Sequence, residues 1–244
     1  TLAKEHQEAL AQSDWARQAS LHTHWRLLPS FFQLLKYLNT HHPNTTIVLR
    51  TFGSDIPEVR AELRAFGQGQ HPCFANQYMD GRNGGLDVTL QDDMLVGALH
   101  RGGTSGIDPH ALSLALGTVD NPPGRDKPPY PCPLSFFTNR AQKMICSMDD
   151  IWSFLDSKSG SLLAWRDDYA FWAKNRFQKD AGKIMLISSE KGALKDIFFD
   201  DNIRHNNPNI IDARERISKH PVAFSQTKNR YLFPVDSYAA IMNE

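Results

Sequence analysis

The sequence predicts an α/β protein with a mostly parallel sheet that carries helices on both faces. Short apolar runs rich in β-branched residues, such as 45–49 and 183–187, have the composition of strands buried on both sides. Segments whose apolar residues follow helical spacing stand between such runs. This alternation favours a parallel sheet, because two parallel strands need a long crossover that a helix usually supplies.

Helices are predicted where helix-forming residues coincide with start signals. Ala, Gln, Glu and Leu are dense at the beginning of the chain, and Pro29 and Pro57 suit the first turns of the next two helices. Ser54 or Asp55 would cap the second of these two. The predicted helices cover 1–28, 29–38, 57–66, 149–156, 164–180 and 234–242.

The ends of the predicted strands are the places where a site is expected. The strands cover 45–49, 183–187, 196–199 and 209–212. In open α/β sheets, ligands bind beyond the carboxyl ends of the strands. Thr51 lies just beyond the first strand, and the pair Asp200 and Asp201 follows the third directly.

Residues 67–149 differ in composition from the segments on either side. Gly and Pro cluster in GQGQHP, DGRNGGLD, HRGGTSGIDP and DNPPGRDKPPYPCP, and only 88–100 and 110–117 have a regular pattern. We therefore expect an irregular insert, or a cap-like loop region, within a single domain that spans 1–244. The glycines near Arg101 would also suit an anion-binding turn of a nucleotide- or sugar-binding module, although a plain turn explains them as well.

Composition limits the classes of partner and the compartment. The 244 residues have zero formal net charge, so nothing draws the whole chain to nucleic acid or to acidic membranes. No apolar run approaches the roughly 20 residues that span a bilayer. We expect neither a nucleic-acid nor a membrane partner. The odd and sparse set of three cysteines favours a reducing compartment, so a cytoplasmic location is expected.

The two adjacent carboxylates are the strongest local indication of chemistry. Asp200 and Asp201 repel each other, and Asn202 follows them, which suggests that a cation lies between or above them. Carboxylate and amide oxygens suit Mg²⁺, which often binds phosphate as well. The alternative is that both carboxylates cap a turn in which Asn202 tolerates a left-handed backbone. His205 is near enough in sequence to be a candidate acid or substrate contact, as is Asn202.

Two strand ends together resemble a known family. The run IVLRT at 47–51 and the run IFFDDN at 197–202 resemble the second and fourth motifs of the haloacid dehalogenase superfamily. Most of its members are Mg²⁺-dependent phosphatases with a Rossmann-like core. Between these motifs the family places a lysine, for which Lys183 is the candidate and Lys174 and Lys179 are the rivals. The resemblance covers about 30–66 and 164–213.

The resemblance implies roles for these positions and a small phosphorylated substrate. Thr51 would hydrogen-bond a phosphoryl oxygen, helped by the backbone N–H of Phe52 or Gly53. Lys183 would neutralise the charge of the phosphate and of the nucleophile. Asp201 would bind Mg²⁺ directly, and Asp200 would bind it directly or through water. The implied activity is Mg²⁺-dependent phosphoester hydrolysis.

The chain departs from the family in its first motif. That motif, Asp-x-Asp-x-Thr, supplies the aspartyl nucleophile and the general acid, and no Asp-x-Asp occurs in the 244 residues. Two explanations stay open. The motif precedes Thr1, and an upstream Asp forms the aspartyl-phosphate that water hydrolyses. Alternatively, the protein has lost the nucleophile and is a nonenzymatic binding or scaffold protein.

Overall fold

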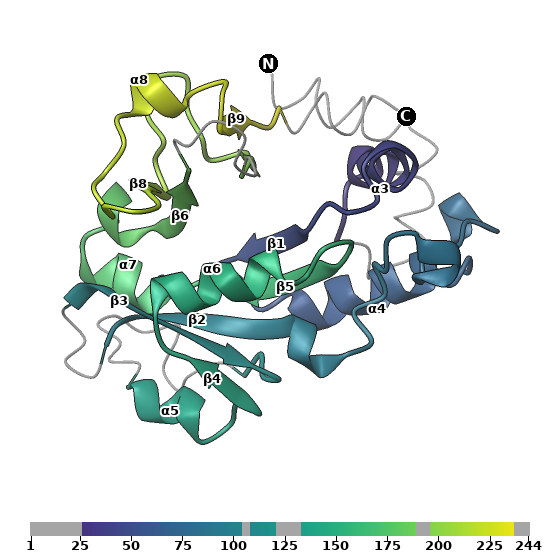
Figure 1. Ribbon diagram of the computed structural model, residues 1–244, viewed down its shortest axis with the longest axis horizontal. Coiled ribbons are helices and arrows are strands. Elements are labelled where there is room, and N and C mark those ends of the chain that lie inside the picture. The colour runs from purple at the N-terminus through teal and green to yellow at the C-terminus, as the bar shows by residue number, and fades with distance from the viewer. Residues whose placement is uncertain (1–25, 104–107, 121–132, 189–195, 237–244) are drawn as a thin grey trace, which may run out of the picture.

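The computed structural model describes residues 26–103, 108–120, 133–188 and 196–236, and it shows a mixed α/β protein (Figure 1). The helices are α3 (Pro29–His41), α4 (Ile56–Gly67), α5 (Leu134–Thr138), α6 (Met148–Asp156), α7 (Tyr169–Lys174) and α8 (Phe224–Thr227). The strands are β1 (Ile47–Thr51), β2 (Val96–Gly102), β3 (Asp108–Leu116), β4 (Lys143–Ile145), β5 (Leu162–Arg166), β6 (Lys183–Ile187), β7 (Phe198–Asp200), β8 (Ile211–Glu215) and β9 (Leu232–Pro234). The predicted α/β class is therefore confirmed.

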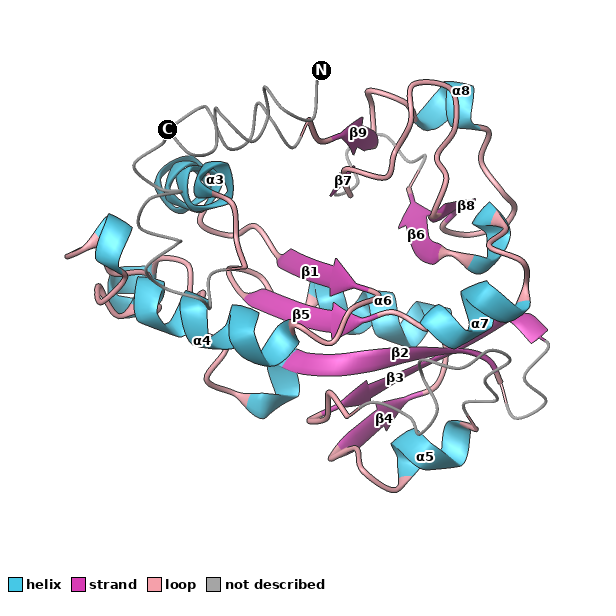
Figure 2. Cartoon of the chain, turned by 180° about the vertical axis from the view of Figure 1, so that it is seen from behind, coloured by secondary structure: helices cyan, strands magenta, loops and turns pink. Residues whose placement is uncertain are grey.

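The principal sheet has five strands in the order β1-β5-β2-β3-β4. β5 pairs in parallel with β1 and with β2, whereas β3 runs antiparallel to both β2 and β4. Every residue of β2 and β5 is buried, so these strands form the centre of the core. Helix α6 crosses one face of this sheet in Figure 1, and α4 lies across the opposite face in Figure 2.

Two smaller parallel sheets follow in the chain, one made of β6 and β8 and the other of β7 and β9. Strand β6 connects them to the principal sheet through its two faces. Ile184 and Leu186 pack into the core of the principal sheet. Met185 and Ile187 pack into a second core, which also contains Leu232. Because alternate side chains of one strand point to opposite faces, β6 belongs to both cores.

The predicted helix over 164–180 is wrong. Residues Leu162–Arg166 form β5, and a helix covers only Tyr169–Lys174. The run LLAWR is buried at all five positions, because it lies between β1 and β2 and has side chains packed on both faces. A short apolar run of this kind carries no periodicity that separates a strand from a helix.

The expectation of an insert at 67–149 is not confirmed, because this range contains β2 and β3. Both are inner strands of the principal sheet. One of the glycines that suggested a loop, Gly102, ends β2. Gly97, in the run 88–100 that has a regular pattern, serves the sheet directly. A Cβ on Gly97 would lie 2.4 Å from the carbonyl oxygen of Ala115, so this glycine allows the close approach of β3 to β2.

Most of the other predicted elements lie within two or three residues of their observed bounds. The helices at 29–38, 57–66 and 149–156 and the strand at 183–187 are confirmed. The remaining strands begin about two residues later than predicted. Of the predicted closing helix at 234–242, Pro234 ends β9 and 237–242 lie outside the described residues, as do residues 1–25 of the predicted first helix. Within the described ranges, every helix is too short or too polar to cross a membrane.

Candidate functional site

Lys183 joins three segments that are far apart in the sequence. It opens β6, and its Nζ donates to Oδ2 of Asp200 over 2.9 Å and to the carbonyl oxygen of Arg50 over 3.2 Å. Arg50 precedes Thr51 at the end of β1, and Asp200 ends β7. The side chains of Lys183 and Asp200 are 7% and 8% exposed. A buried ion pair therefore stands beside the carboxyl end of β1.

Asp200 is held in its ionised form by its neighbours. Burial by itself would raise the pKa of this carboxyl group, but the Lys183 ammonium and the hydrogen bonds from Asn202 outweigh it and hold the pKa below its usual value. The backbone N–H of Asn202 donates to Oδ1 of Asp200 over 2.8 Å, and its side-chain amide donates to the same oxygen over 3.1 Å.

Asn202 also connects the two adjacent carboxylates. Its Nδ2 lies 3.1 Å from Oδ1 of Asp200 and 2.9 Å from Oδ1 of Asp201. Asp201 itself is exposed. One amide thus donates to both carboxylates and reduces the repulsion between them. This arrangement is expected when Asp and Asn residues cap a turn. The same three side chains still present carboxylate and amide oxygens at the end of β7.

The loop after β1 orients the hydroxyl of Thr51. Its Oγ1 accepts from the backbone N–H of Gly53 over 2.7 Å and donates to Oδ1 of Asp55 over 3.0 Å. A Cβ on Gly53 would lie 2.4 Å from that same Asp55 oxygen, so a larger residue here would displace the carboxylate that accepts from Thr51. Before the hydroxyl can donate to a phosphoryl oxygen, it must release Asp55.

The other predicted contacts lie farther from the ion pair or face solvent. His205 is exposed, and its Nδ1 lies 3.2 Å from Nζ of Lys228. Lys174 ends α7 and Lys179 begins a short 3-10 turn at Lys179–Ala181, and both are exposed. Of the three candidate lysines, Lys183 is the one whose ammonium is hydrogen-bonded to Asp200.

The sequence analysis missed a second ion pair at the same place. Arg50 Nε donates to Oδ2 of Asp167 over 3.0 Å, its Nη2 also bonds Asp167, and its Nη1 donates to the carbonyl oxygen of Ile184. The Arg50 and Asp167 side chains are 9% and 5% exposed. The sequence feature that could have indicated this pair is the occurrence of Asp167 and Asp168 directly after an apolar run. That run was assigned to a helix, so its end was not considered as a strand end. Burial raises the pKa of Asp168, which caps α7 by accepting from the N–H of Phe171.

Arg101 is not available to an anion-binding turn. It lies in β2, and its side chain is 3% exposed and paired with Asp212 of β8 over 3.0 Å. An anion held by the turn near Arg101 would therefore not be bound by this guanidinium, which is already used to hold β8 against the principal sheet. Residues 104–107 of that turn lie outside the described residues.

Asp200 and Asp201 supply as many protein ligands as a Mg²⁺ site usually has. Mg²⁺ keeps several waters and is usually bound by one or two carboxylates together with substrate phosphate. Asp201 is exposed, and Asp200 is ionised. Within the described part of the chain, no group of three or more His, Cys, Asp or Glu side chains surrounds a common point. A site that uses only protein ligands, as Ca²⁺ or structural Zn²⁺ would need, is therefore not formed by these residues.

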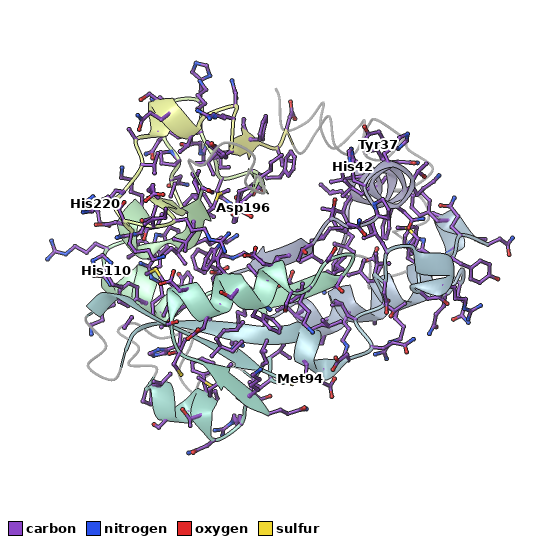
Figure 3. The ribbon with its side chains drawn as sticks, in the orientation of Figure 1. Tyr37, His42, Met94, His110, Asp196 and His220 are labelled. Atoms are coloured by element: carbon purple, nitrogen blue, oxygen red, sulfur yellow. The ribbon has the colours of Figure 1, made fainter. Side chains whose placement is uncertain are left out.

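A carboxyl group near this site gives the protein a pH dependence. Asp196 lies just before β7, in the part of the molecule built by β6–β9 (Figure 3). Burial raises its pKa from 3.8 to about 6, opposed by Arg216 and assisted by Asp156. The protonated form of Asp196 is thus favoured by the fold.

We expect the free energy of unfolding to fall as the pH rises from 4 to 6. Below pH 3.8 the contribution of Asp196 is fully present, and it is lost as the pH passes the folded pKa of about 6, with a size on the order of 3 kcal/mol. Urea titrations at several pH values measure it. Asp196→Asn should reduce the dependence of the free energy of unfolding on pH. Asp149→Asn, at an exposed position, should leave that dependence unchanged. An unchanged slope in Asp196→Asn contradicts the assignment.

Comparison with known proteins adds no relative. No protein-family model, no curated protein and no solved structure matches this chain.

Proposed function

We propose that this protein is a Mg²⁺-dependent phosphoester hydrolase of the haloacid dehalogenase type that acts on a small phosphorylated substrate. The observation that carries the proposal is the contact of Lys183 with Asp200 beside the last residues of β1. These are the positions of three motifs that resemble that family, and they come from three different sheets. The fold brings them together although Lys183 is 133 residues from Arg50 and 17 residues from Asp200.

The residues of this site divide the work between phosphate and metal. Lys183 and the Thr51 hydroxyl would bind the oxygens of the phosphoryl group, since an ammonium and a hydroxyl both donate to them. Asp201 would hold Mg²⁺, with Asp200 as a second ligand or as an acceptor for a bound water. When bound, Mg²⁺ would neutralise negative charge on the phosphoryl oxygens. Asn202 would keep both carboxylates in place through its amide.

A second candidate is a protein that binds phosphate without turnover. It is supported by the absence of Asp-x-Asp from the 244 residues. It is supported also by the hydrogen bonds that already occupy Thr51 and Asp200. In this case Mg²⁺ and the two carboxylates would bind the phosphorylated ligand, and no hydrolysis would follow.

Hydrolysis of p-nitrophenyl phosphate, with Mg²⁺ and with a chelator, tests the proposal. We expect Mg²⁺-dependent turnover, and a loss of about 100-fold in kcat for Thr51→Val, because one oriented donor to the transition state is removed. Thr46→Val is the matched control: Thr46 precedes β1 and donates its hydroxyl to the carbonyl oxygen of Lys158, away from the site. Wild-type protein that binds Mg²⁺ but hydrolyses no phosphoester supports the second candidate instead.

A further inference from the structure

Four aromatic rings stand together beside the candidate site, and we refer to them as the aromatic wall: Phe52, Tyr169, Trp172 and Phe177. Phe52 follows β1 directly, and the other three belong to α7 and the turn after it. α7 lies next to β6 in Figures 1 and 2. Sequence analysis had no reason to join them, because the strand in front of α7 was predicted as helix.

The wall begins at the site and extends away from it. Nζ of Lys183 lies 5.4 Å from the centroid of the Phe52 ring, within the range of a cation–π contact. The Phe52 ring stacks on Trp172 with centroids 4.9 Å apart and planes 8° apart. Phe177 meets Trp172 edge-on at 4.9 Å. A planar group bonded to a phosphate held by Lys183 would therefore meet aromatic surface at once.

Phe177 is the exposed outer edge of the wall, and the backbone holds it there at a cost. Its side chain is 52% exposed. Both Arg176 and Phe177 have positive φ angles, of 56° and 59°. Non-glycine residues rarely adopt this conformation, and it is strained for a bulky side chain. The N–H of Phe177 is fixed by the carbonyl oxygen of Trp172 over 3.0 Å.

We propose that the aromatic wall binds the leaving group of the substrate, so that the substrate class is aryl phosphate monoesters. This inference rests on the proposed function for its reaction, but the binding part stands apart from turnover. In the net reaction, the bond between phosphorus and the aryl oxygen breaks, and the oxygen of one water molecule replaces the aryl oxygen on phosphorus. One proton of that water is balanced by the proton on the phenol that leaves, and inorganic phosphate remains. The wall begins next to Lys183, so the ring is bonded directly to the ester oxygen.

The test measures binding of two phosphonates that cannot be hydrolysed. Isothermal titration with Mg²⁺ compares phenylphosphonate with cyclohexylphosphonate, which is of similar size but not planar. We expect wild-type protein to bind phenylphosphonate about 3- to 10-fold more tightly, the value of one aromatic pair. Phe52→Ala should remove most of that preference, because Phe52 is the ring of the wall nearest to Lys183. Phe52→Leu should not restore it, because Leu supplies apolar area without a π-face.

Tyr78→Ala is the matched control, since Tyr78 is 57% exposed and lies between α4 and β2, outside the wall. It should keep the preference of the wild type. Equal binding of the two phosphonates to wild-type protein overturns the aryl subsite, whether or not the protein hydrolyses phosphoesters. A phenyl preference that depends on Phe52 without turnover of p-nitrophenyl phosphate keeps the subsite and removes the hydrolase. Parallel losses in Phe52→Ala and Tyr78→Ala would overturn the subsite.

Discussion

Replacing Lys183 with alanine is expected to lower the free energy of unfolding by about 3 kcal/mol. The change leaves the carboxylate of Asp200 without its ammonium partner, in a place where its side chain is only 8% exposed. Breaking a buried pair from one side is costly, because the charge that remains has lost its partner but not its burial. Urea denaturation, followed by tryptophan fluorescence, measures the loss.

Two further variants separate the ion pair from other effects of the substitution. Lys183→Ala with Asp200→Ala should recover part of the loss, because the stranded charge is gone. Lys219→Ala is the matched control, since Lys219 pairs with Asp149 at the surface, where side chains are 23% and 76% exposed. It should cost less than about 1 kcal/mol. If Lys183→Ala costs no more than the surface variant, Lys183 does not neutralise a buried Asp200.

The same pair predicts how acid affects the protein. The pKa of Asp200 is below its usual 3.8 in the folded state, so its contribution to stability is present above that value. It is lost as the pH falls through the lower, folded pKa. This loss opposes the effect of Asp196, which is greatest in acid. The double variant of Lys183 and Asp200 should therefore lose less stability below pH 3.8 than the wild type does.

The part of the site that depends on strand ends could be predicted from sequence. Lys183, Thr51 and Asp200 each lie at or next to the end of a short β-branched run, and such runs are local properties of the chain. Lys183 became a candidate through the resemblance to the family, with Lys174 and Lys179 as rivals, and its contact with Asp200 depends on how β6 and β7 lie in space. The loop of Thr51 was also predicted, since glycine at 53 marks a turn.

The remainder depends on contacts between distant segments. The run LLAWR at 162–166 has no feature that separates a strand from a helix, and its position between β1 and β2 decides the matter. Once it was assigned to a helix, Asp167 and its partner Arg50 could not be recognised. The strands at 96–102 and 108–116 overlap the runs 88–100 and 110–117, whose regular pattern was recognised. The Gly and Pro clusters around these runs favoured an insert and not two inner strands of the principal sheet. The aromatic wall could be recognised only after 162–166 was assigned as the strand β5 and the position of α7 was known.

Arg101 gives the second large effect, and we expect Arg101→Met to lower the free energy of unfolding by about 3 to 4 kcal/mol. Its guanidinium donates to the carbonyl oxygens of Gly182 and Asp180 over 2.6 and 3.0 Å, and to Oδ2 of Asp212 over 3.0 Å. Burial lowers the pKa of Arg101, although Asp212 opposes this. The residue thus fastens β2 to both the turn before β6 and to β8, which are the elements that place Lys183.

The shape of the guanidinium, and not only its charge, should decide the outcome. Arg101→Lys keeps the charge but supplies a point donor that cannot reach three acceptors in a plane, so it should recover only a minor part of the loss. Arg140→Met is the matched surface control, because Arg140 and Asp120 are 43% and 63% exposed, and it should cost less than about 1 kcal/mol. Full rescue by lysine would mean that charge alone holds the two sheets together. A loss no larger than that of the Arg140 variant would show that β8 is held by its apolar core, through Ile211 and Leu232, and not by Arg101.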